Sequence, residues 1–304
     1  MPSIDGNSKW VAPDAPVPRH WGVLLMRALA PLPLSWIRAL GVVLGYVLYF
    51  LIPGRRKVVQ TNLALCFPEI APSQRSRWAR QSFVYFAQSW LDRAWLWHAP
   101  PETVRKRLNW VGAVEALEGT HPTVVFAPHF YGLDAAGTAV NLISGRSMVS
   151  IYTPQRNRAV DHWLHSGRRR FGDVHLFFRD QGVKSVVAAL RKGALLYLLP
   201  DMNFGLNESI FVPFFGVPAA TVPSLSRFAR LGNANVVPVT SRITPAGYDV
   251  EVHPAWSDYP SGDVEADTLR MNRWLEDIIR GVPTQYYWVH KRFKDRPPGV
   301  ASVY

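Results

Sequence analysis

The residues of this sequence best suited to acid–base chemistry are His129 and Asp134, which are separated by four residues. The spacing alone is weak evidence of a site. With nine His and fourteen Asp in 304 residues, chance gives about 0.4 pairs at this spacing, and the chain has four, which begin at His129, His175, His253 and His290. The surrounding sequence must therefore decide which pair, if any, has a chemical role.

Only His129 directly follows a compact apolar run, 123–127, and precedes an Ala-rich helical pattern that begins at Asp134. Gly132 between them permits a tight turn. The carboxyl end of a strand in an α/β sheet is where reacting groups gather. A histidine at a strand end with only a structural hydrogen bond is the simpler alternative.

A histidine held by a carboxylate on one ring nitrogen can remove a proton from a hydroxyl with the other. The sequence contains no Gly-x-Ser-x-Gly segment that would supply a serine nucleophile. We therefore expect the attacking hydroxyl to belong to the substrate, with His129 as general base and Asp134 as the group that orients it.

Three further segments carry candidate site residues. Asp201 follows the apolar run 194–199 and precedes Gly205, a position that also suits a simple turn cap. The Phe-rich run 211–216 is most simply core, with a groove for a fatty chain as the alternative. Arginines, which can hold phosphate oxygens bidentately, cluster between the two candidate strand ends at Arg156, Arg158, Arg168, Arg169, Arg170 and Arg179.

The elements that must position these residues follow an α/β rhythm. Strands are predicted over 123–127, 148–152, 194–199, 236–240 and 248–252. Helices are predicted over 133–143, 159–171, 183–192, 222–231 and 268–280, and an amphipathic helical hairpin over 73–110. The pattern predicts a central mixed sheet flanked by helices.

The N-terminal part divides into a Pro-rich leader over 1–20, expected to be disordered, a membrane-anchoring helical segment over 21–57, and an α/β domain over 58–304. The uncharged run 39–52 would rise about 21 Å as a helix, which is short of a roughly 30 Å hydrocarbon core. A span back to Leu32 requires Arg38 to snorkel. A tilted span and an interfacial helix both remain open, and the basic residues 55–57 place the following chain on the cytoplasmic side.

Composition limits the classes of molecule that this protein could bind. A formal charge of +12 and 48% hydrophobic residues suit nucleic acid, an anionic membrane or an acidic carrier protein. The chain has no zinc-finger spacing or RNA-binding signature, and its single cysteine, Cys66, cannot form an intramolecular disulfide. Nucleic acid is therefore disfavoured, and a reducing, cytoplasm-facing compartment fits best.

Several motifs in order resemble the bacterial lipid A biosynthesis acyltransferases, within the wider glycerolipid-type His-x4-Asp acyltransferases. The resemblance runs from about Trp21 to the C-terminus. The matching segments are Arg55–Leu63, Cys66–Glu69, His129-x4-Asp134, Leu199–Asp201 with Gly205, Phe211–Gly216 and Trp288–Pro297.

The resemblance implies transfer of an acyl chain from acyl carrier protein to a hydroxyl of a phosphorylated lipid A precursor similar to Kdo-lipid IVA, at the cytoplasmic face of the inner membrane. We expect no cofactor and no metal. Arg168 and Arg179 would bind phosphate or steady the oxyanion, and Asp201 would support that site. The alternatives are an acyltransferase for another membrane lipid, such as a lysophospholipid or an ornithine lipid, and a non-catalytic lipid-binding protein.

Overall fold

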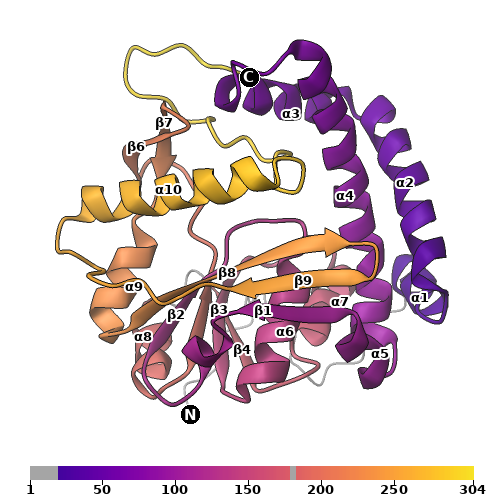
Figure 1. Cartoon of the computed structure of the whole chain (residues 1–304), viewed down its shortest axis with the longest axis horizontal. Helices are drawn as coiled ribbons and strands as arrows, with labels where there is room; N and C mark the ends of the chain where they lie inside the picture. The colour runs from indigo at the N-terminus through magenta and orange to yellow at the C-terminus, as the bar shows by residue number, and fades with distance from the viewer. Residues whose placement is uncertain (1–19, 179–182) are drawn as a thin grey trace.

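The computed structural model describes residues 20–178 and 183–304. The leader predicted over residues 1–20 lies outside them except for His20, and so does Arg179. At the centre of the described chain is a seven-stranded sheet of order β1-β9-β8-β2-β5-β3-β4 (Figure 1). Its strands are β1 (Leu108–Gly112), β2 (Thr123–Phe126), β3 (Met148–Tyr152), β4 (Val174–Phe178), β5 (Leu195–Leu198), β8 (Asn235–Thr244) and β9 (Gly247–Val252).

All neighbouring strands of this sheet are parallel except β8 and β9, which are antiparallel. Central strands of such sheets are apolar on both faces because helices cover both. In β2, Val124 and Phe126 contribute to one buried cluster and Val125 to the other. A separate antiparallel hairpin is formed by β6 (Ile210–Phe214) and β7 (Val217–Thr221).

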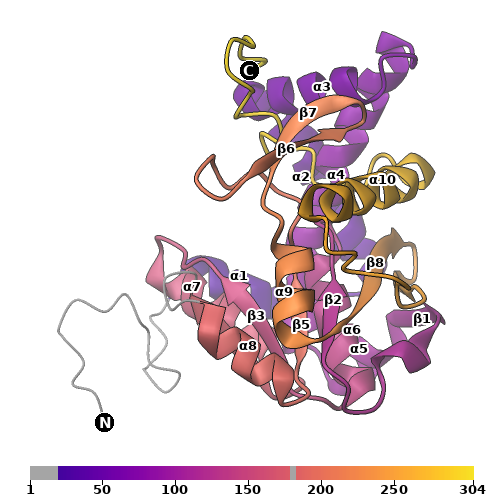
Figure 2. The ribbon, with the colours of Figure 1, turned by 90° about the vertical axis from the view of Figure 1, so that its left-hand side faces the viewer.

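Helices cover both faces of the sheet. The cluster around Val125 includes residues of α4, α6 and α7, and the cluster around Val124 and Phe126 includes residues of α8, α9 and α10. Figure 2 shows α8 and α9 side by side in front of the sheet. The helices are α1 (Trp21–Leu29), α2 (Leu34–Leu51), α3 (Pro53–Cys66), α4 (Pro72–His98), α5 (Pro101–Lys106), the 3₁₀ helix η1 (Val114–Leu117), α6 (Leu133–Ser144), α7 (Arg158–Arg168), α8 (Val183–Arg191), α9 (Ser224–Gly232) and α10 (Val264–Gly281).

The structure confirms the predicted mixed α/β architecture and differs from the prediction in two places. The helical hairpin expected over 73–110 is wrong, because α4 continues unbroken to His98 and is followed by the short α5 and by β1. No Pro or Gly interrupts the chain between Pro72 and Pro100, so nothing in that stretch ends the helix earlier. The strands β1 and β4 and the β6–β7 hairpin were also not predicted.

Helix α2 packs lengthwise against α4 rather than extending away from the domain (Figure 1). A Cβ on Gly41 would lie 2.5 Å from Cγ of Gln88, and one on Gly45 would lie 2.5 Å from Cα of Val84. These two glycines therefore allow the two backbones to approach closely.

Arg38 does not reach out to an interface as the sequence analysis allowed. Its Nη1 lies 3.0 Å from Oδ2 of Asp92 on α4, and its Nη2 donates to the carbonyl of Gly247 at 3.1 Å. Tyr248 and Trp95 donate hydrogen bonds to the same carboxylate, at 2.6 and 3.0 Å. The buried ion pair makes α2 part of the domain's own packing.

Candidate active site

A cavity of about 580 Å³ lies at the carboxyl edge of the sheet, where β2, β3, β4 and β5 end. This volume is within the range of about 300–1,000 Å³ that is usual for small-molecule sites. Most of the lining is apolar or aromatic, including Phe86 and Trp90 of α4, Val186 of α8 and Phe228 of α9. The ionisable groups that line it are Arg93, His129, Asp134, Tyr131, Tyr152, Arg168, Tyr197, Glu208 and Tyr287.

The imidazole of His129 is held by Asp201. Nδ1 of His129 lies 2.7 Å from Oδ1 of Asp201, and the backbone N–H of His129 donates to Oδ2 of the same carboxylate at 3.0 Å. The His129 side chain is 19% exposed, whereas that of Asp201 is fully buried. A carboxylate against Nδ1 keeps the proton on that nitrogen and leaves Nε2 as an acceptor for a substrate proton.

The register of the sheet brings these two residues together. Strands β2 and β5 are neighbours, with Phe126 paired to Leu198. His129 and Asp201 each lie three residues beyond that pair, so the two chains leave the sheet edge side by side.

Burial by itself raises the pKa of Asp201, but the contacts with His129 outweigh it and hold that pKa below its usual value. The hydroxyl of Tyr286 donates a third hydrogen bond to this carboxylate, at 3.0 Å to Oδ2. Asp201 is therefore an ionised, fully buried carboxylate whose hydrogen-bond partners fix its position.

The contact expected between His129 and Asp134 is corrected by this geometry. Asp134 lies in the first turn of α6. Each of its two carboxylate oxygens forms an ion pair, one with Arg93 of α4 and the other with Arg168 of α7. Nε of Arg93 donates to Oδ2 at 2.8 Å, and Nε of Arg168 donates to Oδ1 at 2.8 Å. In the structure the contact with His129 that was expected of Asp134 is made by Asp201, and the contact with Arg168 is made by Asp134.

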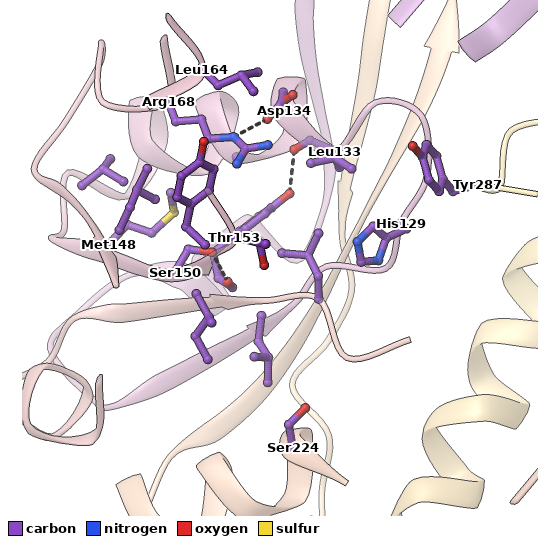
Figure 3. Close-up of a pocket in the computed structure, with 18 of the residues that line it drawn as sticks. His129, Leu133, Asp134, Met148, Ser150, Thr153, Leu164, Arg168, Ser224 and Tyr287 are labelled. Atoms are coloured by element: carbon purple, nitrogen blue, oxygen red, sulfur yellow. Dashed lines mark hydrogen bonds and ion pairs between the residues drawn. The ribbon is translucent and has the colours of Figure 1, made fainter. Parts of the chain in front are cut away.

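Burial raises the pKa of Asp134, but the two guanidinium groups outweigh it and lower that pKa to about 2. The group is thus an anion between two cations, inside the cavity wall. Figure 3 shows Asp134 beside Arg168 and the ring of His129 beside Tyr287, in different parts of the same cavity. Arg93 also lies over the ring of Trp90, 4.3 Å from its centroid.

Comparison with known proteins gives the family of this chain. The model of the bacterial lipid A biosynthesis acyltransferases matches residues 11–295. A lipid A biosynthesis acyltransferase of Haemophilus influenzae is 31% identical, over 93% of this chain and 90% of that protein. The lipid A biosynthesis lauroyltransferase and myristoyltransferase of Escherichia coli are each 30% identical, over 94% of this chain and 96% and 91% of those proteins.

The chain belongs to the bacterial lipid A biosynthesis acyltransferases. In this acyltransferase the C-terminal segment closes the site from one side. The backbone N–H of Tyr287 donates to the carbonyl of His129 at 2.9 Å, and that of Tyr131 donates to the carbonyl of Gln285 at 3.0 Å. The ring of Tyr287 lies 6.1 Å from that of His129. The residues directly before the tail motif thus run beside the candidate base.

His290 of the tail contacts the loop that follows Asp201. Its Nε2 accepts a hydrogen bond from the backbone N–H of Asn203 at 3.2 Å. Burial is the main cause that lowers the pKa of His290 to about 4. Its imidazole is therefore neutral at pH 7 and can keep this acceptor role.

The early motif of α3 meets the same segment. Asn62 donates through Nδ2 to the carbonyls of Trp288 and His290, each at 2.8 Å. Arg55 donates to the carbonyl of Val289 at 3.0 Å. Segments 55–63 and 288–297, which are distant in sequence, are therefore parts of one support for the site.

Sequence reasoning missed Arg93, Tyr286 and Tyr287. Arg93 had a usable signal, because it follows Asp92 in the middle of an aromatic helical run in which charges are unexpected. Of the other spaced pairs, His175 is exposed and contacts Asp173 at 2.9 Å. The Phe-rich run is core in part, as its simpler interpretation predicted: Val212 and Phe214 of the β6–β7 hairpin are fully buried, and the other residues of the run are half-buried or exposed.

Proposed function

We propose that this acyltransferase moves a fatty acyl chain from acyl carrier protein to a hydroxyl of a phosphorylated lipid A precursor similar to Kdo-lipid IVA. One observation carries the proposal: the His129 imidazole, held at Nδ1 by buried Asp201, borders a largely apolar cavity of about 580 Å³. A base at the wall of a cavity that suits a hydrocarbon chain fits acyl transfer to an alcohol. The names of the relatives, which describe lipid A acylation, support the choice of acceptor.

In the proposed reaction the acceptor hydroxyl attacks the thioester carbonyl carbon, and Nε2 of His129 takes the hydroxyl proton. The carbonyl carbon becomes tetrahedral and its oxygen becomes an oxyanion. When this intermediate collapses, the carbon–sulfur bond breaks and the imidazolium returns its proton to the leaving thiolate. An ester and a free thiol remain. Asp201 stays ionised and stabilises the imidazolium.

Arg168 and Arg93 are proposed to act on negative charge in the cavity. Asp134 holds both guanidinium groups at the cavity wall, and the Arg168 side chain keeps 29% exposure. A cation in that position can stabilise the oxyanion or bind an acceptor phosphate. Arg179, proposed for the same task from its sequence, lies outside the described residues.

We place the protein at the inner membrane, with the site on the cytoplasmic side. Among the described residues, α2 is the helix long and apolar enough to cross a membrane. Its face away from α4 is a stripe of large exposed apolar side chains: Trp36, Leu40, Val43, Val47 and Phe50. Because α4, with which α2 packs, carries three arginines near its start and the pair Asp92–Arg93 farther on, the stripe suits a helix that lies in the membrane surface better than one that spans it.

The test of the function uses the purified protein, a carrier-bound acyl thioester and a lipid A precursor, with the product identified by its mass. We expect a gain of one acyl chain with the wild type and none with His129→Ala. His175→Ala, at an exposed histidine, is the matched control and should keep full activity.

Three results would change the proposal. Transfer only to a lysophospholipid or an ornithine lipid would show that the acceptor is not a lipid A precursor. Unchanged transfer by His129→Ala would show that His129 is not the general base. Vesicle binding without transfer to any acceptor would favour a non-catalytic lipid-binding protein.

The membrane placement has its own test. Val43→Asp with Phe50→Asp should abolish flotation with vesicles of bacterial phospholipid, while the activity on a detergent-dispersed acceptor persists. Flotation that survives these changes would refute the stripe as the membrane contact.

A further inference from the structure

Helices α8 and α9 present a surface that the proposed mechanism does not use. Neither helix contains Asp or Glu. Exposed basic side chains on the two helices and on the residue after α8 form what we call the α8–α9 cationic face: Lys184, Arg191, Lys192, Arg227 and Arg230.

The N-terminal parts of the two helices, which carry Lys184 and Arg227, lie next to the cavity. Val183 and Val186 of α8 and Phe228 of α9 line the cavity, so the two helices that carry the cations also form part of its wall. Phe204 also lines the cavity, and Val183 and Phe204 are each 48% exposed. An apolar rim that continues into the cavity therefore lies beside a surface rich in positive charge.

The two helices are held together as one surface. They pack side by side (Figure 2), and Nε of Arg191 donates to the carbonyl of Leu231 at 2.8 Å. The two helices that carry the cations therefore form one continuous surface. Among the described residues that line the cavity, the acidic side chains are Asp134 and Glu208, and Glu208 lies on the loop between β5 and β6.

We infer that the α8–α9 cationic face is the docking surface for the acidic carrier protein that delivers the acyl thioester. The inference rests on the proposed function, which requires such a donor, and adds where it binds. A carrier of net negative charge is attracted by the basic side chains of two helices that contain no Asp or Glu, and the nearby cavity mouth would admit the chain that the carrier holds.

The position of this face favours a protein partner over a membrane lipid. In Figure 1, α8 and α9 lie on the opposite side of the molecule from α2. When the apolar stripe of α2 contacts the membrane, the cationic face is turned away from it. The carrier would then approach from the aqueous side.

The test compares two donors with the double variant Arg227→Glu/Arg230→Glu in the intact protein. One donor is the acyl chain on the carrier protein, and the other is the same chain on pantetheine alone. We expect the KM for the carrier-bound donor to rise about tenfold or more, because two attractive charges become repulsive. The kcat with either donor and the KM for acyl-pantetheine should stay within about twofold of the wild type.

Two controls separate docking from folding and from total charge. Arg105→Glu/Lys106→Glu, at exposed cations of α5, makes the same charge change away from the cavity and should leave both KM values unchanged. Arg227→Gln/Arg230→Gln avoids new negative charge and should raise the carrier KM by a smaller factor. The wild-type KM for the carrier should also increase with salt, and less steeply in the Glu variant.

An unchanged carrier KM in the α9 variant would overturn the inference. So would an equal rise for both donors, or a loss of binding to anionic vesicles in place of the KM effect. If the wild type uses acyl-pantetheine but not the carrier, the assigned partner is wrong. If it uses neither donor, the proposed function itself fails.

Discussion

Replacement of Asp201 by Asn tests which carboxylate orients the candidate base. In the wild type, Oδ1 of Asp201 accepts from Nδ1 of His129 at 2.7 Å, and Oδ2 accepts from the backbone N–H of His129 at 3.0 Å. A backbone N–H can only donate. The carboxamide oxygen of Asn should therefore take the Oδ2 position, and its NH2 group should face Nδ1.

That orientation selects the wrong imidazole tautomer. A donor against Nδ1 of His129 moves the ring proton to Nε2, the nitrogen that must accept the proton of the alcohol. The corresponding change in a Ser-His-Asp triad costs about 10⁴ in kcat. We expect a fall of about 10³ to 10⁴ here, which corresponds to about 4–5.5 kcal/mol on the barrier.

The assay is kcat with donor and acceptor both saturating, for Asp201→Asn beside two other variants. Tyr286→Phe removes one hydrogen bond to Oδ2 but leaves the tautomer unchanged, so its kcat should fall by less than about tenfold. Asp134→Asn perturbs the arginine pair and not the orientation of His129. The reasoning would be refuted if the kcat of Asp201→Asn stayed within tenfold of wild type while the kcat of Asp134→Asn fell by 10³ or more. The orienting role would then belong to Asp134.

Three other changes test the packing and the electrostatics. Arg38→Met leaves Asp92 buried without its cation, so the free energy of unfolding should fall by about 3–5 kcal/mol, measured by denaturant unfolding in detergent. Gly45→Leu places a Cβ 2.5 Å from the backbone of Val84 and should lower the Tm by several degrees, whereas Gly54→Leu, where no atom lies within 4 Å of a Cβ, should not. Because its pKa is lowered to about 2, ionised Asp134 adds about 2 kcal/mol to the free energy of unfolding above pH 4, and this contribution is lost as the pH falls through 2. Asp134→Asn should therefore flatten the pH dependence of unfolding in that window. An unchanged slope would contradict the ion-pair assignment.

The sequence predicted the strands whose ends carry the site, because each is a short, wholly apolar run between helical patterns. It also placed both His129 and Asp201 at strand ends. What it could not provide is strand order. Only the adjacency of β2 and β5, with Phe126 opposite Leu198, shows that these two ends meet.

Because strand order was unknown, proximity in sequence favoured Asp134 as the partner of His129. Two residues five positions apart suggest a local pair, whereas a partner 72 positions away leaves no periodic signal. Arg93, which holds Asp134, comes from α4, and its approach depends on how that helix crosses the sheet. Contacts of this kind follow from tertiary packing, which one sequence does not specify.

The absence of a protein nucleophile in the proposed reaction has a kinetic consequence. If the alcohol attacks the thioester directly, both substrates must occupy the cavity together, and each needs its own approach. Helix α2 lies on the opposite side of the molecule from α8 and α9 (Figure 1), and α4, which packs against α2, forms one wall of the cavity while α8 and α9 form another. Initial rates with both substrates varied should therefore give intersecting double-reciprocal lines. Parallel lines, the pattern of a covalent acyl-enzyme, would show that a residue of the chain carries the acyl group and that His129 activates that residue instead of the lipid hydroxyl.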